Sequence, residues 1–201
     1  MTKDFTDCLR DYIKEGKESV PRPKGKPDWA ELNYIVGNNT VSYYKVLNSK
    51  NNLSKEGLYK IFENYFTYAY GSGKAVIENK NPQDCSIVAK GIYADIHNYF
   101  SGWGSIENYD VKHIVNIQCR EGRARVTITI GDYNIHVKNN KSFRSSDFTR
   151  NIAAYEPFGR EKDKEMTECL MKLERLIILQ IGEMQKAIDE GNTAVDTIDN
   201  W

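Results

Sequence analysis

The strongest constraint on the fold is a pair of alternating segments that flank Glu121-Gly122. In residues 111–120 and 123–130, apolar side chains and His113 occupy every second position, and mostly polar side chains lie between them. Successive side chains of a strand point to opposite faces, so this period of two predicts two half-buried strands. A two-residue connection that contains glycine favours a tight antiparallel turn. The sequence therefore predicts a β-hairpin with one apolar face and one polar face.

The rest of the chain supplies further strands and two helices. Residues 40–47 are rich in β-branched and aromatic side chains, which is typical of a strand. Ser54 is the expected N-cap of a helix whose apolar residues recur at i, i+3 and i+4 as far as Ala69. The expected elements are a strand at 40–47, a helix at 54–70, strands at 75–79, 86–99, 111–120 and 123–137, and a helix from 164 to 190. This order predicts an α+β fold of strand, helix, four antiparallel strands and helix, with one polar sheet face.

We expect one folded domain, residues 39–191, between two less regular ends. A chain of 201 residues is long enough to bury an independent core. Residues 1–38 are expected to form a short N-terminal helix or arm followed by a Pro-rich linker, and residues 192–201 a tail. Residues 138–162 are polar and longer than an ordinary connection, so they are either mobile or functional.

The charge balance argues against a strong attraction to polyanions. Lysine plus arginine and aspartate plus glutamate number 28 each, so the formal net charge is zero. A nucleic-acid partner would therefore need a local basic patch. The four cysteines are far apart in the sequence, which favours free thiols over a disulfide framework.

Hydropathy gives an expectation for the compartment. No run of about 18 apolar residues occurs, so no membrane span is expected. Residues 1–18 alternate charges where an export signal needs a continuous apolar core. We therefore expect a cytoplasmic location, or the bacterial envelope if a signal has been removed.

Four short segments are similar to those of a known protein family. They are Leu53-Ser54-Lys55-Glu56-Gly57-Leu58-Tyr59, Ser86-Ile87-Val88-Ala89-Lys90-Gly91, Arg120-Glu121-Gly122-Arg123-Ala124-Arg125 and Asp199-Asn200-Trp201. With these segments the chain, over about residues 40–190, resembles a bacterial family of unknown function, typical of Bacteroidetes, with a TATA-binding-protein-like fold. The resemblance implies an α+β architecture and no activity, because none of the segments is catalytic. Members of that family commonly begin with an export signal.

No segment carries a motif for catalysis or for a cofactor. Gly71-Ser72-Gly73-Lys74 lacks the earlier glycine and the following Ser or Thr of a phosphate-binding loop, so it indicates a helix end and a turn. His97, His113 and His136 do not have the local spacing of metal ligands, and neither a metal nor a cofactor is expected. His113 is expected to be a hydrogen-bonded core histidine on the apolar face of the sheet.

The polar face of the predicted hairpin holds most of the candidate binding residues. They are Lys112, Asn116, Gln118, Arg120, Arg123 and Arg125. Such a face either binds phosphates or a polypeptide, or is an ordinary solvated surface. Tyr99 and Trp103 are either core anchors or part of a stacking surface. Asp95 and His97 are either an acid-base pair or two polar residues on a solvent-facing strand end.

Three functions are consistent with these candidates. The first is a non-enzymatic binding or scaffolding domain that holds a protein, a peptide or a small ligand on the polar face and its neighbouring aromatics. The second is an enzyme with a site near Asp95, His97 and Trp103. The third is weak nucleic-acid binding by the polar face and the basic residues from Lys17 to Lys26, which the net charge disfavours. A homodimer through the apolar run 176–179 is also consistent with the sequence.

Overall fold

The predicted hairpin is the centre of the sheet. The computed structural model describes residues 33–36, 40–69, 75–101, 104–139, 147–154 and 164–191. The longest strands are β5 (Ser105–Arg120) and β6 (Arg123–Asn139), which are joined by a turn at Glu121-Gly122. Buried and more exposed side chains alternate along 111–120 and 123–130, and Ile117, Val126 and Ile128 are fully buried. The hairpin and its apolar face are therefore confirmed.

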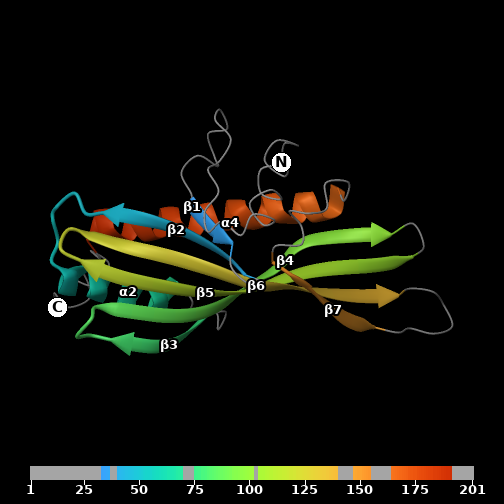
Figure 1. Cartoon of the computed structure of the whole chain (residues 1–201), viewed down its shortest axis with the longest axis horizontal. Coiled ribbons are helices and arrows are strands. Elements are labelled where there is room, and N and C mark those ends of the chain that lie inside the picture. Colours follow the sequence, from blue (N-terminus) through green and yellow to red (C-terminus); the bar gives the residue numbers. More distant parts are fainter. Residues whose placement is uncertain are drawn as a thin grey trace, which may run out of the picture. The chain divides into compact units, whose positions relative to one another are not determined.

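All seven described strands belong to one sheet. The other five are β1 (Asn33–Val36), β2 (Val41–Asn48), β3 (Ala75–Asn81), β4 (Ser86–Ser101) and β7 (Phe148–Ala153). The strand order is β1-β2-β6-β5-β4-β3, and β7 pairs with β6 (Figure 1). The pairs β3 with β4 and β6 with β7 are antiparallel. The sheet is thus built around the hairpin, and two of its strands, β1 and β7, were not predicted from sequence alternation.

Two helices complete the described part of the chain: α2 (Lys55–Ala69) and α4 (Lys164–Glu190). The N–H of Gly57 donates a hydrogen bond of 3.1 Å to Ser54 Oγ, which confirms the predicted N-cap of α2. Gly191 follows α4 with a φ of 60°, a conformation that ends helices. The described part of the chain is therefore α+β, with a mostly antiparallel sheet and two helices, which is the fold class that the sequence predicted.

The order of elements differs from the predicted one by two strands. β1 lies in the segment 1–38 that we expected to be an arm and linker, and β7 lies in the expected excursion 138–162. β1 has only four residues, and the first four residues of β7 are all exposed, so neither shows a useful alternation. The predicted N-terminal helix, most of the linker and the tail lie outside the described residues.

Contacts between residues group the chain into two compact units. Unit 1 comprises Met1–Tyr43, Ile92–His113 and Thr129–Leu176. Unit 2 comprises Tyr44–Gly91, Ile114–Ile128 and Ile177–Trp201. Among the described elements, β1 and β7 belong to unit 1, and α2, β3 and the hairpin turn belong to unit 2.

Within unit 2, the hairpin turn is bonded to the loop that precedes α2. The N–H of Ser49 donates to the Gly122 carbonyl at 2.8 Å, and the N–H of Gly122 donates to the Leu53 carbonyl at 2.9 Å. Gly122 has a φ of 70°, which favours glycine. A Cβ atom at this position would also collide with Oδ1 of Asn52. The backbone conformation therefore favours glycine here, and any larger residue would also displace the Asn52 side chain.

We expect Gly122→Ala to lower the free energy of unfolding by about 2 kcal/mol, because the substitution strains the backbone and displaces Asn52. The matched control is Gly182→Ala in α4, where a Cβ would meet nothing within 4 Å. That change should raise the free energy of unfolding by about 1 kcal/mol, since alanine favours a helix interior. Urea unfolding followed by circular dichroism measures both. Equal effects of the two variants would contradict the account of the turn.

Candidate functional site

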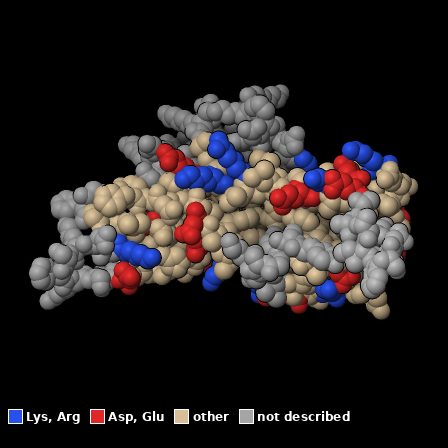
Figure 2. Space-filling view, turned by 180° about the vertical axis from the view of Figure 1, so that it is seen from behind, with Lys and Arg blue, Asp and Glu red and all other residues tan. Residues whose placement is uncertain are grey.

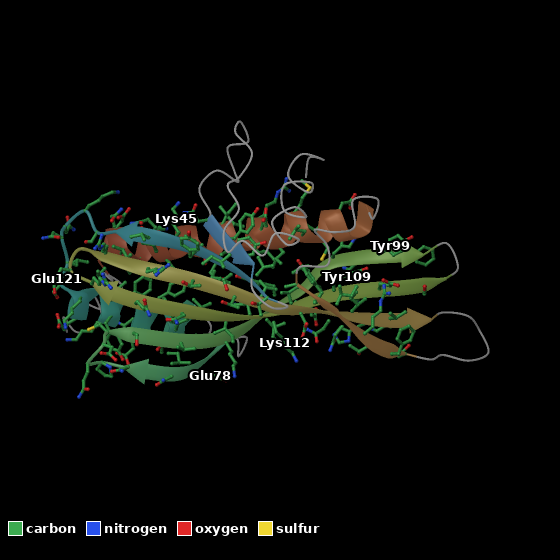
Figure 3. All side chains as sticks on the ribbon, viewed as in Figure 1. Lys45, Glu78, Tyr99, Tyr109, Lys112 and Glu121 are labelled. Atoms are coloured by element: carbon green, nitrogen blue, oxygen red, sulfur yellow. The ribbon has the colours of Figure 1, made fainter. Side chains whose placement is uncertain are left out.

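The candidate residues of the hairpin that lie in unit 2 are on the more exposed side of the strands. Gln118 and the three arginines are exposed, and Asn116 is half-buried. The arginines are Arg120, Arg123 and Arg125, and they occupy the end of the hairpin that carries the turn. Figure 3 shows this end, which is marked by Glu121. Within unit 2, α2 lies on one side of these strands (Figure 1).

Apolar and aromatic side chains lie among these polar ones. Val46 of β2 is 46% exposed and Ile114 of β5 is 40% exposed. The guanidinium carbon of Arg125 is 5.4 Å from the centre of the Tyr44 ring, a cation–π contact. The surface is therefore a mixed one, with aliphatic, aromatic and guanidinium groups together. We call Tyr44, Val46, Ile114, Asn116, Gln118, Arg120, Arg123 and Arg125 the arginine face.

The arginine face carries positive charge that the described residues do not neutralise. None of its three guanidinium groups forms an ion pair with a residue in the described ranges. By contrast, Lys90 of β4 is paired with Glu78 of β3 at 2.6 Å. The opposite view of the molecule shows basic and acidic side chains interspersed (Figure 2). The three arginines are therefore a local excess of positive charge, although the net charge of the whole chain is zero.

The structure does not assemble the other candidates into one site. Lys112 is exposed and Tyr99 is half-buried, and both belong to unit 1 (Figure 3). Trp103 lies outside the described residues. The candidate set therefore reduces to the arginine face in unit 2 and separate residues in unit 1.

The interpretation of Asp95 and His97 as a pair on one face is wrong. Asp95 has a φ of 51°, and this left-handed residue interrupts the alternation of β4, so that Ile96 and His97 are both buried while Asp95 is exposed. Nδ1 of His97 lies 2.9 Å from Nζ of Lys172 on α4. Lys172 donates this hydrogen bond, and the His97 side chain is buried beneath α4. His97 is therefore unavailable to a ligand at the surface.

His113 is buried as predicted, but it is not satisfied. Its ring stacks on Tyr93 with centroids 4.0 Å apart, and neither ring nitrogen has a hydrogen-bond partner among the described residues. Burial lowers the pKa of His113 to about 4. The neutral imidazole therefore acts as an aromatic core residue.

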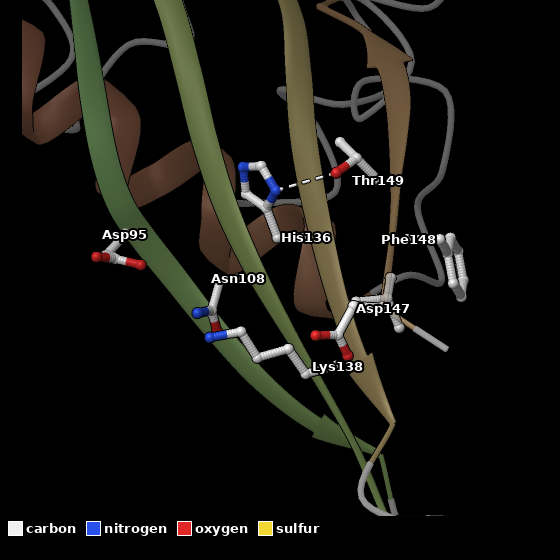
Figure 4. Close-up of a pocket in the computed structure, with 8 residues that line it drawn as sticks. Asp95, Asn108, His136, Lys138, Asp147, Phe148 and Thr149 are labelled. Carbon is white, nitrogen blue, oxygen red and sulfur yellow. Dashed lines mark hydrogen bonds between the residues drawn. The ribbon is translucent and has the colours of Figure 1, made fainter. Parts of the chain in front are cut away.

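A pocket in unit 1 was not predicted. Its volume is about 450 Å³, and it crosses four strands: Asp95 lies on β4, Asn108 on β5, His136 and Lys138 on β6, and Thr149 on β7 (Figure 4). Asp147 and Phe148 line it at the start of β7. These residues are far apart in the sequence, and β7 itself was not expected. Only the pairing of β7 with β6, which sets Thr149 opposite His136, brings them together.

A chain of polar contacts runs along the wall of this pocket. The N–H of Asp95 donates to Oδ1 of Asp110 at 2.8 Å, and Oδ2 of Asp110 lies 3.3 Å from Nε2 of His136. Nδ1 of His136 lies 3.1 Å from the Thr149 hydroxyl. If Nε2–H donates to Asp110, Nδ1 accepts from Thr149, and the threonine oxygen keeps lone pairs for another donor.

The described cysteines and acidic residues offer no alternative centre. Cys85, Cys119 and Cys169 are buried free thiols, as predicted, and burial raises the pKa of Cys119 and Cys169 to about 12. The thiols of Cys119 and Cys169 are therefore protonated and poorly nucleophilic. In the described ranges, no group of three or more His, Cys, Asp or Glu residues has the geometry of a metal site. Neither α2 nor α4 has the length and apolar character to cross a membrane.

Comparison with known proteins gives similar folds and no activity. No family model matches the chain, and no curated protein matches it in sequence. A DUF4468 family protein from Bacteroides ovatus is similar in structure at 13% identity and a TM-score of 0.48, over 82% of this chain and 94% of that one. A TBP-like protein from Parabacteroides distasonis is similar at 13% identity and a TM-score of 0.41, over 76% of this chain and 95% of that one. At this identity the two structures assign no role to any residue of this chain.

The buried neutral His113 makes stability depend on pH. The pKa of His113 is about 4 in the folded protein, against an ordinary value of 6.5 in an unfolded chain, so the unfolded chain binds more protons between these two pH values. Stability should therefore fall as the pH falls from 6.5 to 4. Relative to His113→Phe, the wild type should lose about 2 kcal/mol of unfolding free energy between about pH 7 and about pH 5. Urea unfolding at both pH values measures this difference. If the unfolding free energies of the two proteins change equally with pH, the prediction is wrong.

Proposed function

We propose that this protein is a non-enzymatic binding domain whose arginine face holds an acidic polypeptide segment. The observation that carries the proposal is the set of exposed guanidinium groups without an ion pair among the described residues, next to exposed aliphatic side chains. Guanidinium groups bind carboxylates through two parallel hydrogen bonds. The partner of complementary chemistry is therefore one that alternates acidic and apolar side chains.

The arrangement at the turn supports an acidic partner in particular. A two-residue turn pairs the residues that flank it, so Arg120 lies opposite Arg123. Like charges at directly opposite positions of a strand pair are destabilising. A carboxylate bound between them would remove this repulsion, and the benefit appears only in the complex.

The apolar residues of the face supply the second part of the recognition. Val46 and Ile114 are each at least 40% exposed, and the Tyr44 ring under Arg125 is a rigid aromatic surface. Interfaces are enriched in aromatic residues and arginine, and buried apolar contacts at their centre provide much of the affinity. A purely polar solvated face would not combine these groups.

The other two functions have less support. An enzyme near Asp95, His97 and Trp103 relied on an acid-base pair, and His97 is buried and bonded to Lys172. For weak nucleic-acid binding, the basic segment from Lys17 to Lys26 lies outside the described residues, and the net charge of the chain is zero. We therefore treat nucleic acid as a competing outcome of the binding test.

The double variant Arg123→Glu/Arg125→Glu should weaken binding of a labelled synthetic peptide of alternating glutamate and valine by about 100-fold, because two charge-assisted contacts become repulsive. Fluorescence anisotropy measures the affinity. Thermal unfolding should be nearly unchanged, since both side chains are exposed.

The matched control is Lys60→Glu/Lys186→Glu, which changes the net charge by the same amount on α2 and α4 of unit 2. This control should keep most of the affinity. If both double variants bind equally, or if the wild type does not bind the peptide, the arginine face is not a binding site for acidic polypeptide. Tighter binding to a mixed-sequence DNA duplex, with a steep salt dependence, would point to the nucleic-acid function instead.

A further inference from the structure

We propose that the pocket in unit 1 is a second binding site, independent of the arginine face, and that its ligand is a neutral oligosaccharide. The pocket extends from Asp95 on β4 to Phe148 on β7 (Figure 4). From β4 to β7 the pocket crosses three spacings between adjacent strands, which is about 14 Å in total. This length suits a ligand of more than one sugar ring. Its volume of about 450 Å³ is in the ordinary range of ligand sites.

Four polar side chains face the pocket without a partner among the described residues. Asp95, Asn108, Lys138 and Asp147 line it, and none makes a side-chain hydrogen bond or ion pair with a described residue. A carboxylate or an amide can bind two neighbouring hydroxyl groups at once, because each offers two adjacent polar atoms. The pocket therefore presents hydrogen-bonding groups suited to a ligand that carries several hydroxyls.

The polar wall makes Thr149 a further acceptor. Its hydroxyl proton is directed to Nδ1 of His136 when Nε2–H of that ring donates to Asp110. The backbone N–H of Asp95 holds the Asp110 carboxylate in place through a hydrogen bond of 2.8 Å. Hydrogen bonds in such a chain polarise one another, so the Thr149 oxygen is a good acceptor for a ligand hydroxyl. The carboxylates of Asp95 and Asp147 also line the pocket. The pocket therefore has more hydrogen-bond acceptors than donors and fits a ligand rich in O–H groups.

The charges in the pocket favour a neutral ligand over an ionic one. Asp95 and Asp147 repel an anion, and the Lys138 ammonium repels a cation. A sugar carries many donors without a net charge. It can therefore bind all these groups without placing like charges together.

Phe148 supplies an apolar contact at the edge of the pocket. Its side chain is 50% exposed although it lies on a strand, and the ring marks one end of the pocket in Figure 4. A half-exposed ring beside hydrogen-bonding groups can contact the C–H face of a sugar while the polar residues bind its hydroxyls. Arg150 secures this strand, because its guanidinium donates to Glu107 of β5 at 2.8 Å.

Titration calorimetry with maltotriose, cellotriose and mannotriose tests the proposal. At least one trisaccharide should bind with a Kd of about 1 mM, because there is one site and it is open to solvent. Affinity should be the same within about twofold at about 0.05 M and about 0.5 M salt, because the ligand is neutral. No heat with any of the three sugars would overturn the proposal. Binding of spermidine instead, lost at high salt, would show a cation site and would also overturn it.

Two substitutions locate the binding in this pocket. Phe148→Ala and Thr149→Val should each weaken trisaccharide binding by about fivefold, because each removes roughly one contact with the sugar. The matched control is Phe100→Ala, which removes an aromatic ring that is 63% exposed on β4 of the same unit and does not line the pocket. That control should bind normally, and an equal loss with Phe100→Ala would exclude this pocket. Arg123→Glu/Arg125→Glu should also bind the sugar normally, which separates this proposal from that of the arginine face.

Discussion

Burial of one face of the β5–β6 hairpin is the interaction on which the rest of the structure depends. Val115 and Ile117 on one strand and Val126 and Ile128 on the other are almost fully removed from water. Each side chain of this size contributes about 1.5–3 kcal/mol when it is buried. A slip of one residue would expose all of them and bury their polar neighbours, so this set of residues specifies the register strongly. The same alternation forces Gln118, Arg120, Arg123 and Arg125 outward.

A second constraint acts where β4 departs from regular geometry. Regular alternation after Ala89 would place Asp95 and His97 on the same face. The left-handed backbone at Asp95 shifts the phase, so that the carboxylate reaches the pocket and the imidazole lies under α4. The backbone N–H of Asp95 is bonded to the Asp110 carboxylate, which stabilises this conformation. One residue with unusual backbone angles thus determines which of the two side chains can contact a ligand.

The two candidate surfaces differ in how far the sequence could predict them. The arginines of the arginine face follow from alternation and the two-residue turn, because Arg120, Arg123 and Arg125 are close in the sequence and a strand shows every second side chain on one face. Tyr44 and Val46 belong to the face only because β2 lies beside β6 in the sheet. The pocket could not be found in this way. Asp110, His136 and Thr149 are 26 and 13 residues apart along the chain, and their proximity depends on the pairing of β6 with β7.

The sequence by itself determined the hairpin, both helices, the N-cap at Ser54 and the α+β class, since these depend on local periodicity, capping and turn residues. The tertiary structure alone decided three further features: the short strands β1 and β7, the burial of His97, and the polar chain from Asp95 to Thr149. Each of these depends on which distant strand or helix lies beside a residue. Local propensity cannot specify such a neighbour, because the burial and the hydrogen bonds that stabilise it appear only once the sheet has formed.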